Sequence, residues 1–361
     1  MKVQKSFYDP SIDYDDNFDN GPVKVYDDTK PYENKGEPKY EVLGKKVYSP
    51  FGIPAGPLLN SSYIKYAFER GFDVLCYKTQ RSIVTKSNQF PQVLYVDING
   101  DLTLEKADEP LVGLTETSKS PTDLSITNSF GNPSRGPEFW VEDLKKAKSY
   151  QGDGQLLIMS VVGSIQEGFS EEDYWDDFAA TAELAAGAGV EAIELNLSCP
   201  NVATEGVLCY THDAVVEICK RVKEKVGNTP VVAKFGYFST DQQELLEKIA
   251  TDASPFLSAI SAINTISAPV VDEAGEQALP GPNRLKSGVC GASIKWAGLD
   301  MVARLKALRE KLNLEFEIFG VGGVMTPQDF KTYRKAGADC VQSATGAMWN
   351  PHLAQEIKEK L

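Results

Sequence analysis

Residues 157–198, LIMSVVGSIQEGFSEEDYWDDFAATAELAAGAGVEAIELNLS, contain two short apolar runs on either side of one amphipathic segment. The runs at 157–163 and 191–198 are rich in aliphatic residues, which is typical of buried β-strands. The segment between them, 170–189, begins with an acidic turn and ends in glycine, as helices often do. The stretch therefore predicts a strand, a helix and a second strand in succession, which is the building unit of α/β folds.

The same alternation continues along the chain from Gly52 onward. Candidate strands lie at 52–56, 73–79, 157–163, 191–198, 231–235, 259–266, 316–321 and 340–345. The clearest helical segments lie at 170–189, 213–226, 241–253, 292–312 and 351–361. Eight strand–helix units predict a closed (β/α)₈ TIM barrel. An open doubly wound sheet is the rival fold, but GIPAGPLLNS (52–61) lacks the GxGxxG loop that such sheets carry after their first strand.

The N-terminal residues do not follow this alternation. Residues 1–40 are acidic, rich in Asp, Tyr, Pro and Gly, and have no sustained apolar period. We expect an irregular N-terminal arm, whose tyrosines can hold it against a surface, and one barrel domain over residues 41–361. The segment VLGKKVYSPFGI (42–53) indicates a hairpin around Gly44, which either plugs one end of the barrel or lies on the surface.

The connection after the second strand is unusually long. It spans residues 80–137, before a helix predicted at 138–150, and includes VLYVDINGDLTL (93–104), which alternates like a hairpin turning at Asn99-Gly100. A loop of that size in a compact domain is usually functional. In a barrel it would lie on the C-terminal face, where active sites form.

Composition excludes several classes of function. The 361 residues include 51 acidic and 37 basic side chains, for a net charge of −14, and 42% of them are hydrophobic. The chain can therefore build a sizeable core, while its charge repels the phosphates of nucleic acids and anionic membranes. We expect no nucleic-acid partner and no insertion into a membrane.

Histidine and cysteine usage argues against a metal site. The chain has only two histidines, His212 and His352, and its six cysteines include no CxxC pair, so we expect no metal centre. Free thiols indicate a reducing compartment. The N-terminus has no apolar signal-peptide core, and no apolar run reaches the length of a membrane span, so we expect a cytoplasmic protein.

Polar side chains follow several of the predicted strands at the point where each strand ends. They are Lys78, Asn196, Cys199, Asn201, Lys234, Asn264 and Thr265, joined by Asn128 from the long connection. Any one of them alone is explained by a solvated rim charge, a capped turn or a buried thiol. Together, at matching ends of barrel strands, they predict a functional cleft.

Glycine and other small residues follow the last two strands. They form Gly320-Val321-Gly322-Gly323 and Ser343-Ala344-Thr345-Gly346, while Gly288 and Gly291 precede a predicted helix. Such loops bind phosphate through backbone N–H groups in many barrels. A phosphate-bearing cofactor such as flavin mononucleotide (FMN) fits this pattern, with its ring near Lys78 and Lys234. Asparagines donate and accept hydrogen bonds at once, which suits a pyrimidine substrate.

These segments resemble the dihydroorotate dehydrogenase family. The similar segments are CYKT (76–79), NSFGNP (128–133), NLSCPN (196–201), AKFG (233–236), INTIS (263–267), SGVCGASIK (287–295) and FGVGG (319–323). The resemblance covers residues 45–361 and implies an FMN-containing barrel that oxidises dihydroorotate to orotate in pyrimidine synthesis. The cysteine of NLSCPN is typical of the soluble class 1 type, because the membrane-associated class has serine at that position.

The resemblance also implies a role for each matched residue. Cys199 would be the base that removes a proton from C5 of the substrate while hydride passes from C6 to flavin N5, and Cys209 is the competing thiol. Lys78 would assist the reaction. The implied substrate-binding residues are Asn128, Phe130, Gly131, Asn196, Asn201, Asn264 and Thr265. The implied cofactor-binding residues are Ala55, Gly56, Lys78, Thr79, Asn128, Asn196, Lys234, Asn264, Gly291, Gly322, Gly323, Ala344 and Thr345.

Other functions stay open at this point. The same motifs resemble the pyrimidine-reducing domain of dihydropyrimidine dehydrogenase, which implies a uracil-type substrate and an electron-transfer partner. A third hypothesis is an inactive barrel that acts as a binding protein. The electron acceptor is also open between fumarate, a quinone and NAD reached through a partner flavoprotein. A homodimer is expected by resemblance alone.

Overall fold

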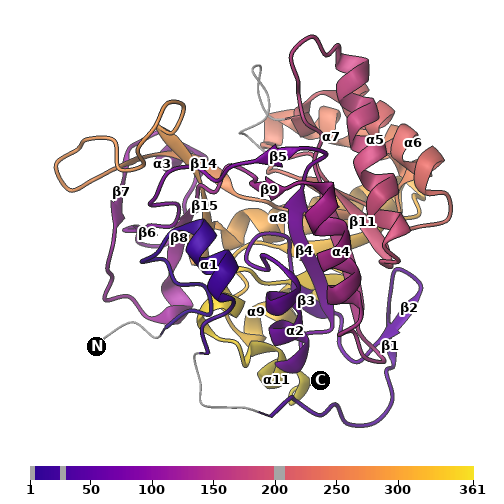
Figure 1. Ribbon diagram of the computed structural model, residues 1–361, viewed down its shortest axis with the longest axis horizontal. Helices are drawn as coiled ribbons and strands as arrows, with labels where there is room; N and C mark the ends of the chain where they lie inside the picture. Colours follow the sequence, from indigo (N-terminus) through magenta and orange to yellow (C-terminus); the bar gives the residue numbers. More distant parts are fainter. Residues whose placement is uncertain (1–4, 25–29, 199–207) are drawn as a thin grey trace.

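Eight parallel strands close into a barrel at the centre of the chain (Figure 1). The computed structural model describes residues 5–24, 30–198 and 208–361. Around the barrel the strands are β3 (Phe51–Ile53), β4 (Val74–Gln80), β10 (Leu156–Val161), β11 (Ala192–Asn196), β12 (Val231–Phe235), β13 (Ala259–Ala262), β16 (Glu317–Val321) and β17 (Cys340–Gln342). Each lies within or beside one of the eight predicted strands, so the predicted (β/α)₈ TIM barrel is confirmed.

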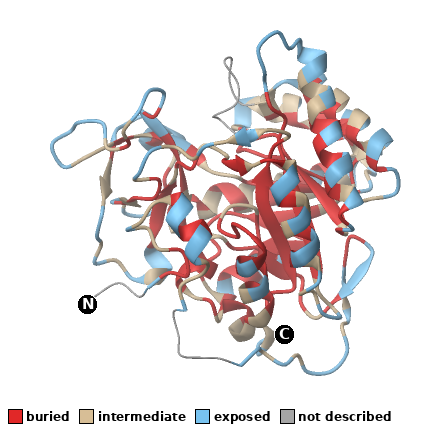
Figure 2. Cartoon of the chain, viewed as in Figure 1, coloured by how far each residue is buried: buried red, intermediate tan, exposed pale blue. Residues whose placement is uncertain are grey.

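A helix follows each barrel strand and turns its apolar side inward, so that buried residues line the strands and the inner helix faces (Figure 2). The helices are α2 (Ser61–Glu69), α4 (Pro137–Lys148), α5 (Glu171–Gly187), α6 (His212–Val226), α7 (Gln243–Ala253), α8 (Lys295–Leu312), α9 (Pro327–Ala336), α10 (Thr345–Trp349) and α11 (Leu353–Lys358). At the start of α5, the Ser170 hydroxyl accepts from the Asp173 N–H and the Asp173 carboxylate accepts from the Ser170 N–H. This reciprocal cap explains why the helix begins where the sequence predicts.

The predicted hairpin plugs the N-terminal end of the barrel. Strands β1 (Tyr40–Val42) and β2 (Lys45–Val47) pair antiparallel through a turn in which Leu43 and Gly44 have φ values of 50° and 73°. Val42 and Val47 are fully buried and pack in one cluster with the barrel-interior residues around Ile158. Of the two positions that the sequence left open, the plug is therefore confirmed.

The inner face of the barrel changes from apolar to polar along the strand direction. The layer that packs against the hairpin includes Ala192, Val232 and Cys340. Side chains two positions further along a strand point to the same face. Those residues are Glu194, Lys234 and Gln342, all buried. Polar chemistry is thus concentrated toward the carboxyl ends of the strands, as expected for a barrel enzyme.

A second, smaller closed sheet of five strands lies beside the barrel, at the left of Figure 1. The connection after β4 supplies β6 (Tyr95–Val96), β7 (Leu111–Leu114) and β8 (Ser125–Asn128), and the insertion after β13 supplies β14 (Ile266–Val271) and β15 (Lys286–Gly291). The same connection carries β5 (Val84–Thr85), which pairs with β9 (Ser134–Arg135). This sheet joins two distant segments of the chain at the rim of the barrel.

The predicted hairpin around Asn99-Gly100 is wrong. Strand β6 pairs instead with β7, and residues 101–103, where the second strand was predicted, lead without regular structure into the helix α3 (Leu104–Ala107). The Thr103 side chain accepts a hydrogen bond from the Lys106 N–H, which caps this helix. Local capping therefore prevails over the apolar alternation of the segment.

The N-terminal arm is more ordered than the sequence predicts. It contains the helix α1 (Tyr14–Asn20), whose N-cap Asp13 accepts from the Asp16 N–H at 2.8 Å. The aromatic residues Phe7, Tyr8, Tyr14 and Phe18 are buried against the barrel domain. The arm is thus irregular only in part, and its tyrosines do hold it in place.

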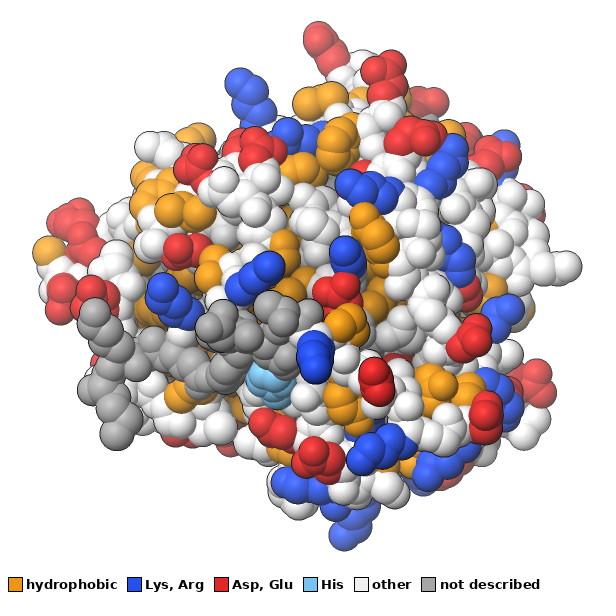
Figure 3. Space-filling model, turned by 60° about the horizontal axis from the view of Figure 1, so that its bottom comes forward, with side chains coloured by type: hydrophobic (Ala, Val, Ile, Leu, Met, Phe, Trp, Pro, Cys, Tyr) orange, Lys and Arg blue, Asp and Glu red, His pale blue; other side chains and the backbone are white. Residues whose placement is uncertain are grey.

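Acidic and basic side chains are interspersed over the face shown in Figure 3. Among the described residues, every helix is too short or too polar to serve as a transmembrane segment.

Candidate active site

Two adjoining cavities open at the carboxyl ends of the barrel strands. We call the larger the glycine cavity, because Gly291, Gly322, Gly323 and Gly346 line it, and the smaller the asparagine cavity, because Asn128, Asn196 and Asn264 line it. With their open mouths included, they enclose about 720 Å³ and about 480 Å³. Volumes of this size suit small-molecule ligands. The residues common to both cavities are Ala55, Gly56, Asn128, Phe130, Lys234, Asn264 and Thr265.

Hydrogen bonds connect the polar side chains of the asparagine cavity. The Asn264 side-chain amide donates to the Ser198 hydroxyl at 2.9 Å, and that hydroxyl donates to the Asn196 side-chain oxygen at 3.5 Å. The Asn196 amide in turn donates to the Thr79 hydroxyl at 3.3 Å. The chain of contacts crosses from β4 to the end of β13 and fixes the orientation of both amides.

Two buried lysines place positive charge in the cleft. The Lys234 ammonium lies 3.5 Å from the Ala55 carbonyl oxygen and 3.9 Å from the Glu194 carboxylate. The Lys78 ammonium lies 5.2 Å from the centroid of the Phe130 ring. In a site of low dielectric these charges attract an anionic or electron-rich ligand more strongly than they would in water. Amides and ammonium groups together suit a planar ring that bears carbonyl and carboxylate oxygens.

The glycine cavity is bounded by tight turns after β16 and β17. Gly322 and Gly323 have φ values of 123° and 63°, and a Cβ atom on Gly323 would lie 2.6 Å from the Lys295 Cβ. Only glycine fits both the conformation and the close approach. After β17 the Ser343 hydroxyl donates to the Val324 carbonyl and accepts from the Ala347 N–H, which joins the two turns.

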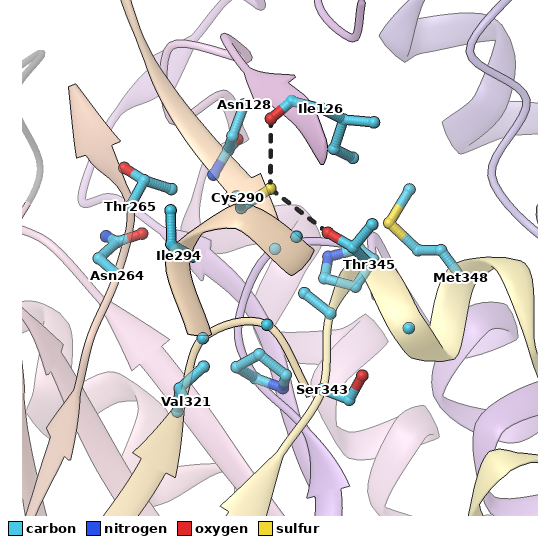
Figure 4. A pocket seen from close by; sticks show the side chains of 18 of the residues that line it. Ile126, Asn128, Asn264, Thr265, Cys290, Ile294, Val321, Ser343, Thr345 and Met348 are labelled. Carbon is cyan, nitrogen blue, oxygen red and sulfur yellow. Dashed lines mark hydrogen bonds between the residues drawn. The ribbon is translucent and has the colours of Figure 1, made fainter. Parts of the chain in front are cut away.

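Figure 4 shows the cavity between these turns and the five-stranded sheet, with Asn264 and Thr265 on one side and Thr345 and Met348 on the other. Cys290 faces it, accepting from the Thr345 hydroxyl at 3.5 Å and donating to the Ile126 carbonyl at 3.6 Å. Burial raises the pKa of the Cys290 thiol to about 11. The thiol is therefore protonated at neutral pH, and Cys290 forms part of the cavity wall rather than acting as a nucleophile.

Nearly all of the predicted site residues come together here. Those lining one or both cavities are Ala55, Gly56, Lys78, Thr79, Asn128, Phe130, Gly131, Asn196, Lys234, Asn264, Thr265, Gly291, Gly322, Gly323, Ala344 and Thr345. Cys199 and Asn201 lie outside the described residues. Their common location is a finding, whereas the role of each stays a prediction.

Some lining residues were not predicted. Gln342 is a fully buried side chain inside β17, and neither its oxygen nor its nitrogen has a partner among the described residues. The sequence could have indicated Gln342, because a polar residue at an inward-facing position of a barrel strand is unusual. Tyr8 and Met348 also line the glycine cavity. Nothing in the arm or in the last helices distinguishes them by pattern.

The chain is similar to known proteins over most of its length. The family model described as dihydroorotate dehydrogenase matches residues 115–361. A Dictyostelium discoideum protein named dihydroorotate dehydrogenase is 39% identical over 98% of this chain and 97% of its own length. The catalytic subunit of dihydroorotate dehydrogenase B (NAD(+)) from Alkaliphilus oremlandii is 28% identical over 73% of this chain and 82% of its own. Dihydroorotate dehydrogenase A (fumarate) from Lactobacillus helveticus is 30% identical over 65% of this chain and 71% of its own.

The family match spans more than half of the chain, and the match to the Dictyostelium protein extends through the N-terminal arm to nearly every residue. The chain therefore belongs to the dihydroorotate dehydrogenase family of oxidoreductase enzymes.

Proposed function

We propose that the protein is an FMN-dependent dihydroorotate dehydrogenase that oxidises dihydroorotate to orotate in pyrimidine biosynthesis. One observation carries the proposal: Lys78, Asn128, Asn196 and Asn264 line one cavity, which shares a wall with a second cavity built from glycine turns. The first suits a pyrimidine with a carboxylate, and the second suits a nucleotide phosphate. The names of the relatives support the same substrate.

The glycine cavity fits a flavin nucleotide. The turns at Gly322, Gly323, Ala344 and Thr345 would hold the phosphate through backbone N–H groups, and the unpartnered Gln342 amide offers hydrogen bonds to a polar ligand. Lys234 would lie beside the ring and stabilise negative charge on it. When bound, FMN supplies the hydride acceptor of the reaction.

The polar residues of the asparagine cavity would bind and orient the substrate. Asn128, Asn196 and Asn264 would hydrogen-bond its ring amides and carboxylate, with Lys78 supplying a positive charge. Because Ser198 already bonds to both Asn196 and Asn264, the amides are oriented before the substrate arrives. Preorganised donors of this kind cost little reorganisation during the reaction.

We assign the base to Cys199, which directly follows Ser198 at the end of β11. A thiol with an ordinary pKa of about 8.5 needs only a modest shift to accept a proton near neutral pH. The rival thiol, Cys209, is fully buried, and burial raises its pKa to about 12. Its proton would be far harder to remove, which favours Cys199.

We further propose a cytoplasmic homodimer that passes electrons to fumarate, a quinone or a partner flavoprotein. Relatives named for fumarate and for NAD(+) both match this chain. Reoxidation of the reduced protein by each acceptor in turn would assign the natural one.

The test is an absorption spectrum of the purified protein followed by anaerobic titration. We expect a visible flavin band that dihydroorotate bleaches, that orotate shifts, and that dihydrouracil leaves unchanged. A protein that neither holds nor binds FMN overturns the proposal. Bleaching by dihydrouracil but not by dihydroorotate would show that the substrate is a uracil-type pyrimidine instead.

A further inference from the structure

Tyr8 belongs to the N-terminal arm, yet it lines the glycine cavity. Its side chain is 1% exposed, and its ring packs edge-on against Phe130, with the ring centroids 5.5 Å apart. Phe130 itself lines both cavities. A residue from the first ten of the chain thus forms part of the wall of a site that is otherwise built from the barrel and its connections.

The Tyr8 hydroxyl is buried without a hydrogen-bond partner among the described residues. Buried hydroxyl groups are nearly always paired, because desolvation without a partner is costly. Of the unpartnered polar side chains in the described part of the chain, Tyr8 and Gln342 line the glycine cavity. Two residues that are distant in sequence and line the same cavity therefore each carry a buried polar group with unused hydrogen-bonding capacity.

The arm holds Tyr8 in this position through its neighbours. The Phe7 N–H donates to the Met348 carbonyl oxygen at 3.0 Å, and the Phe7 carbonyl accepts from the Val23 N–H at 2.8 Å. The Phe7 ring also packs edge-on against Tyr63, with centroids 6.1 Å apart. Met348 lies on α10, the helix that begins at Thr345 beside the predicted phosphate turn. The arm is thus fastened directly to the cofactor end of the barrel.

The surroundings of Tyr8 indicate the kind of ligand it meets. Phe130 contacts Tyr8, and Val93, Ile126 and Met348 also line the cavity, so apolar side chains form a large share of its wall. Apolar and aromatic walls with a small number of hydrogen-bonding groups are typical of sites for aromatic heterocycles. Burial also raises the pKa of the Tyr8 phenol far above its ordinary value, which keeps the hydroxyl protonated as a donor.

We propose that the Tyr8 hydroxyl donates a hydrogen bond to the bound flavin nucleotide, so that the N-terminal arm is an integral part of the cofactor site. This inference rests on the proposed function, which identifies the ligand as FMN. Because linkage is reciprocal, docking of the arm and binding of FMN stabilise each other. No residue of the arm was predicted from the sequence to take part in binding.

The test compares Tyr8→Phe with Tyr14→Phe in the full-length holoprotein. Tyr14 is an apt control, because it is also a buried tyrosine of the arm, packs on the same Phe130 ring at 5.7 Å and does not line either cavity. Release of FMN on dilution, followed by the recovery of flavin fluorescence, gives the dissociation constant. We expect Tyr8→Phe to raise this constant about 3- to 10-fold, the effect of one net hydrogen bond, and Tyr14→Phe to leave it within about 2-fold.

Thermal unfolding of the flavin-free proteins supplies a second readout. Since Tyr8→Phe removes an unpaired buried hydroxyl, the flavin-free variant should be at least as stable as the wild type, which a merely structural role for the hydroxyl would not produce. Equal release of FMN from wild type and Tyr8→Phe overturns the inference and leaves the proposed function intact. A wild-type protein that cannot hold FMN overturns both.

Discussion

Glu194 and Lys234 form an ion pair inside the barrel, with the carboxylate 3.9 Å from the ammonium and side-chain exposed fractions of 1% and 4%. The pair connects two neighbouring strands, because the register places Glu194 opposite Val232 and Asn196 opposite Lys234. The Cys76 thiol donates to the same carboxylate at 3.7 Å. Glu194 thus lies directly beneath the cavities and holds the lysine that faces them.

Removing the carboxylate should destabilise the protein. In Glu194→Gln the buried ammonium loses its counter-charge, and we expect the free energy of unfolding to fall by about 3 kcal/mol in chemical denaturation. The double variant Glu194→Gln/Lys234→Met, which leaves no unpaired charge, should recover most of that loss. It should bind FMN poorly, because it lacks the Lys234 ammonium. A double variant as unstable as Glu194→Gln would show that the lost stability does not come from an unpaired charge.

Ser198 should control substrate affinity through the two asparagines that it orients. Ser198→Ala removes the acceptor of the Asn264 amide and the donor to Asn196. We expect KM for dihydroorotate to rise about 10-fold, because both amides lose the partner that orients them. The control is Ser164→Ala, which removes a buried serine that lines neither cavity. An unchanged KM in Ser198→Ala would show that the Ser198 hydroxyl has no role in substrate binding.

Gly323 should be required for cofactor binding. Its φ of 63° disfavours any side chain, and the added Cβ of Gly323→Ala would lie 2.8 Å from the Lys295 backbone nitrogen and Cα. We expect loss of FMN together with a stability cost of about 2 kcal/mol. Gly187→Ala, at an uncrowded helical position without a positive φ, is the matched control and should leave flavin content unchanged. Full flavin occupancy in Gly323→Ala would show that the turn at Gly323 does not bind the flavin phosphate.

The barrel plug should make stability depend on pH. Burial raises the pKa of Glu317 to about 7, although its carboxylate accepts from the Leu43 N–H of the plug at 2.7 Å. The folded-state pKa of Glu317 lies above the unfolded-state value of about 4.3. Its contribution to the free energy of unfolding is therefore fully present below pH 4.3 and is lost as the pH rises through 7.

Glu317→Gln, which cannot ionise, should lack this loss. In denaturation at pH 4.5 and pH 8 we expect the variant to gain stability relative to the wild type at the higher pH, by at most about 3 kcal/mol. Parallel pH profiles for the two proteins would exclude Glu317 as the cause.

The barrel could be predicted because its signals are local and repeated. Each of the runs at 157–163, 191–198 and 231–235 is short, apolar and followed by an amphipathic helical segment, and such patterns need no tertiary information. The strand-end lysines and asparagines were predictable for a related reason. Parallel barrel strands bring their carboxyl ends to one face, so residues far apart in sequence are placed together once the fold is known.

Other features depend on contacts that sequence patterns do not carry. Strands β14 and β15 were not predicted, since Pro269 and Gly288 weaken their strand signal, and each strand pairs on its other side with a segment more than one hundred residues away. The position of Tyr8 is of the same kind. It depends on a backbone hydrogen bond between Phe7 and Met348, at opposite ends of the chain.

The most direct test of the account is the anaerobic reduction of the bound flavin by dihydroorotate in Cys199→Ala and Cys209→Ala. General-base catalysis contributes at least about 100-fold, so Cys199→Ala should reduce the flavin more than 100-fold more slowly than the wild type. Cys209→Ala, which removes a buried thiol with a pKa raised to about 12, should react within a few-fold of the wild-type rate. Reduction at the wild-type rate in Cys199→Ala would contradict the proposed chemistry of this site.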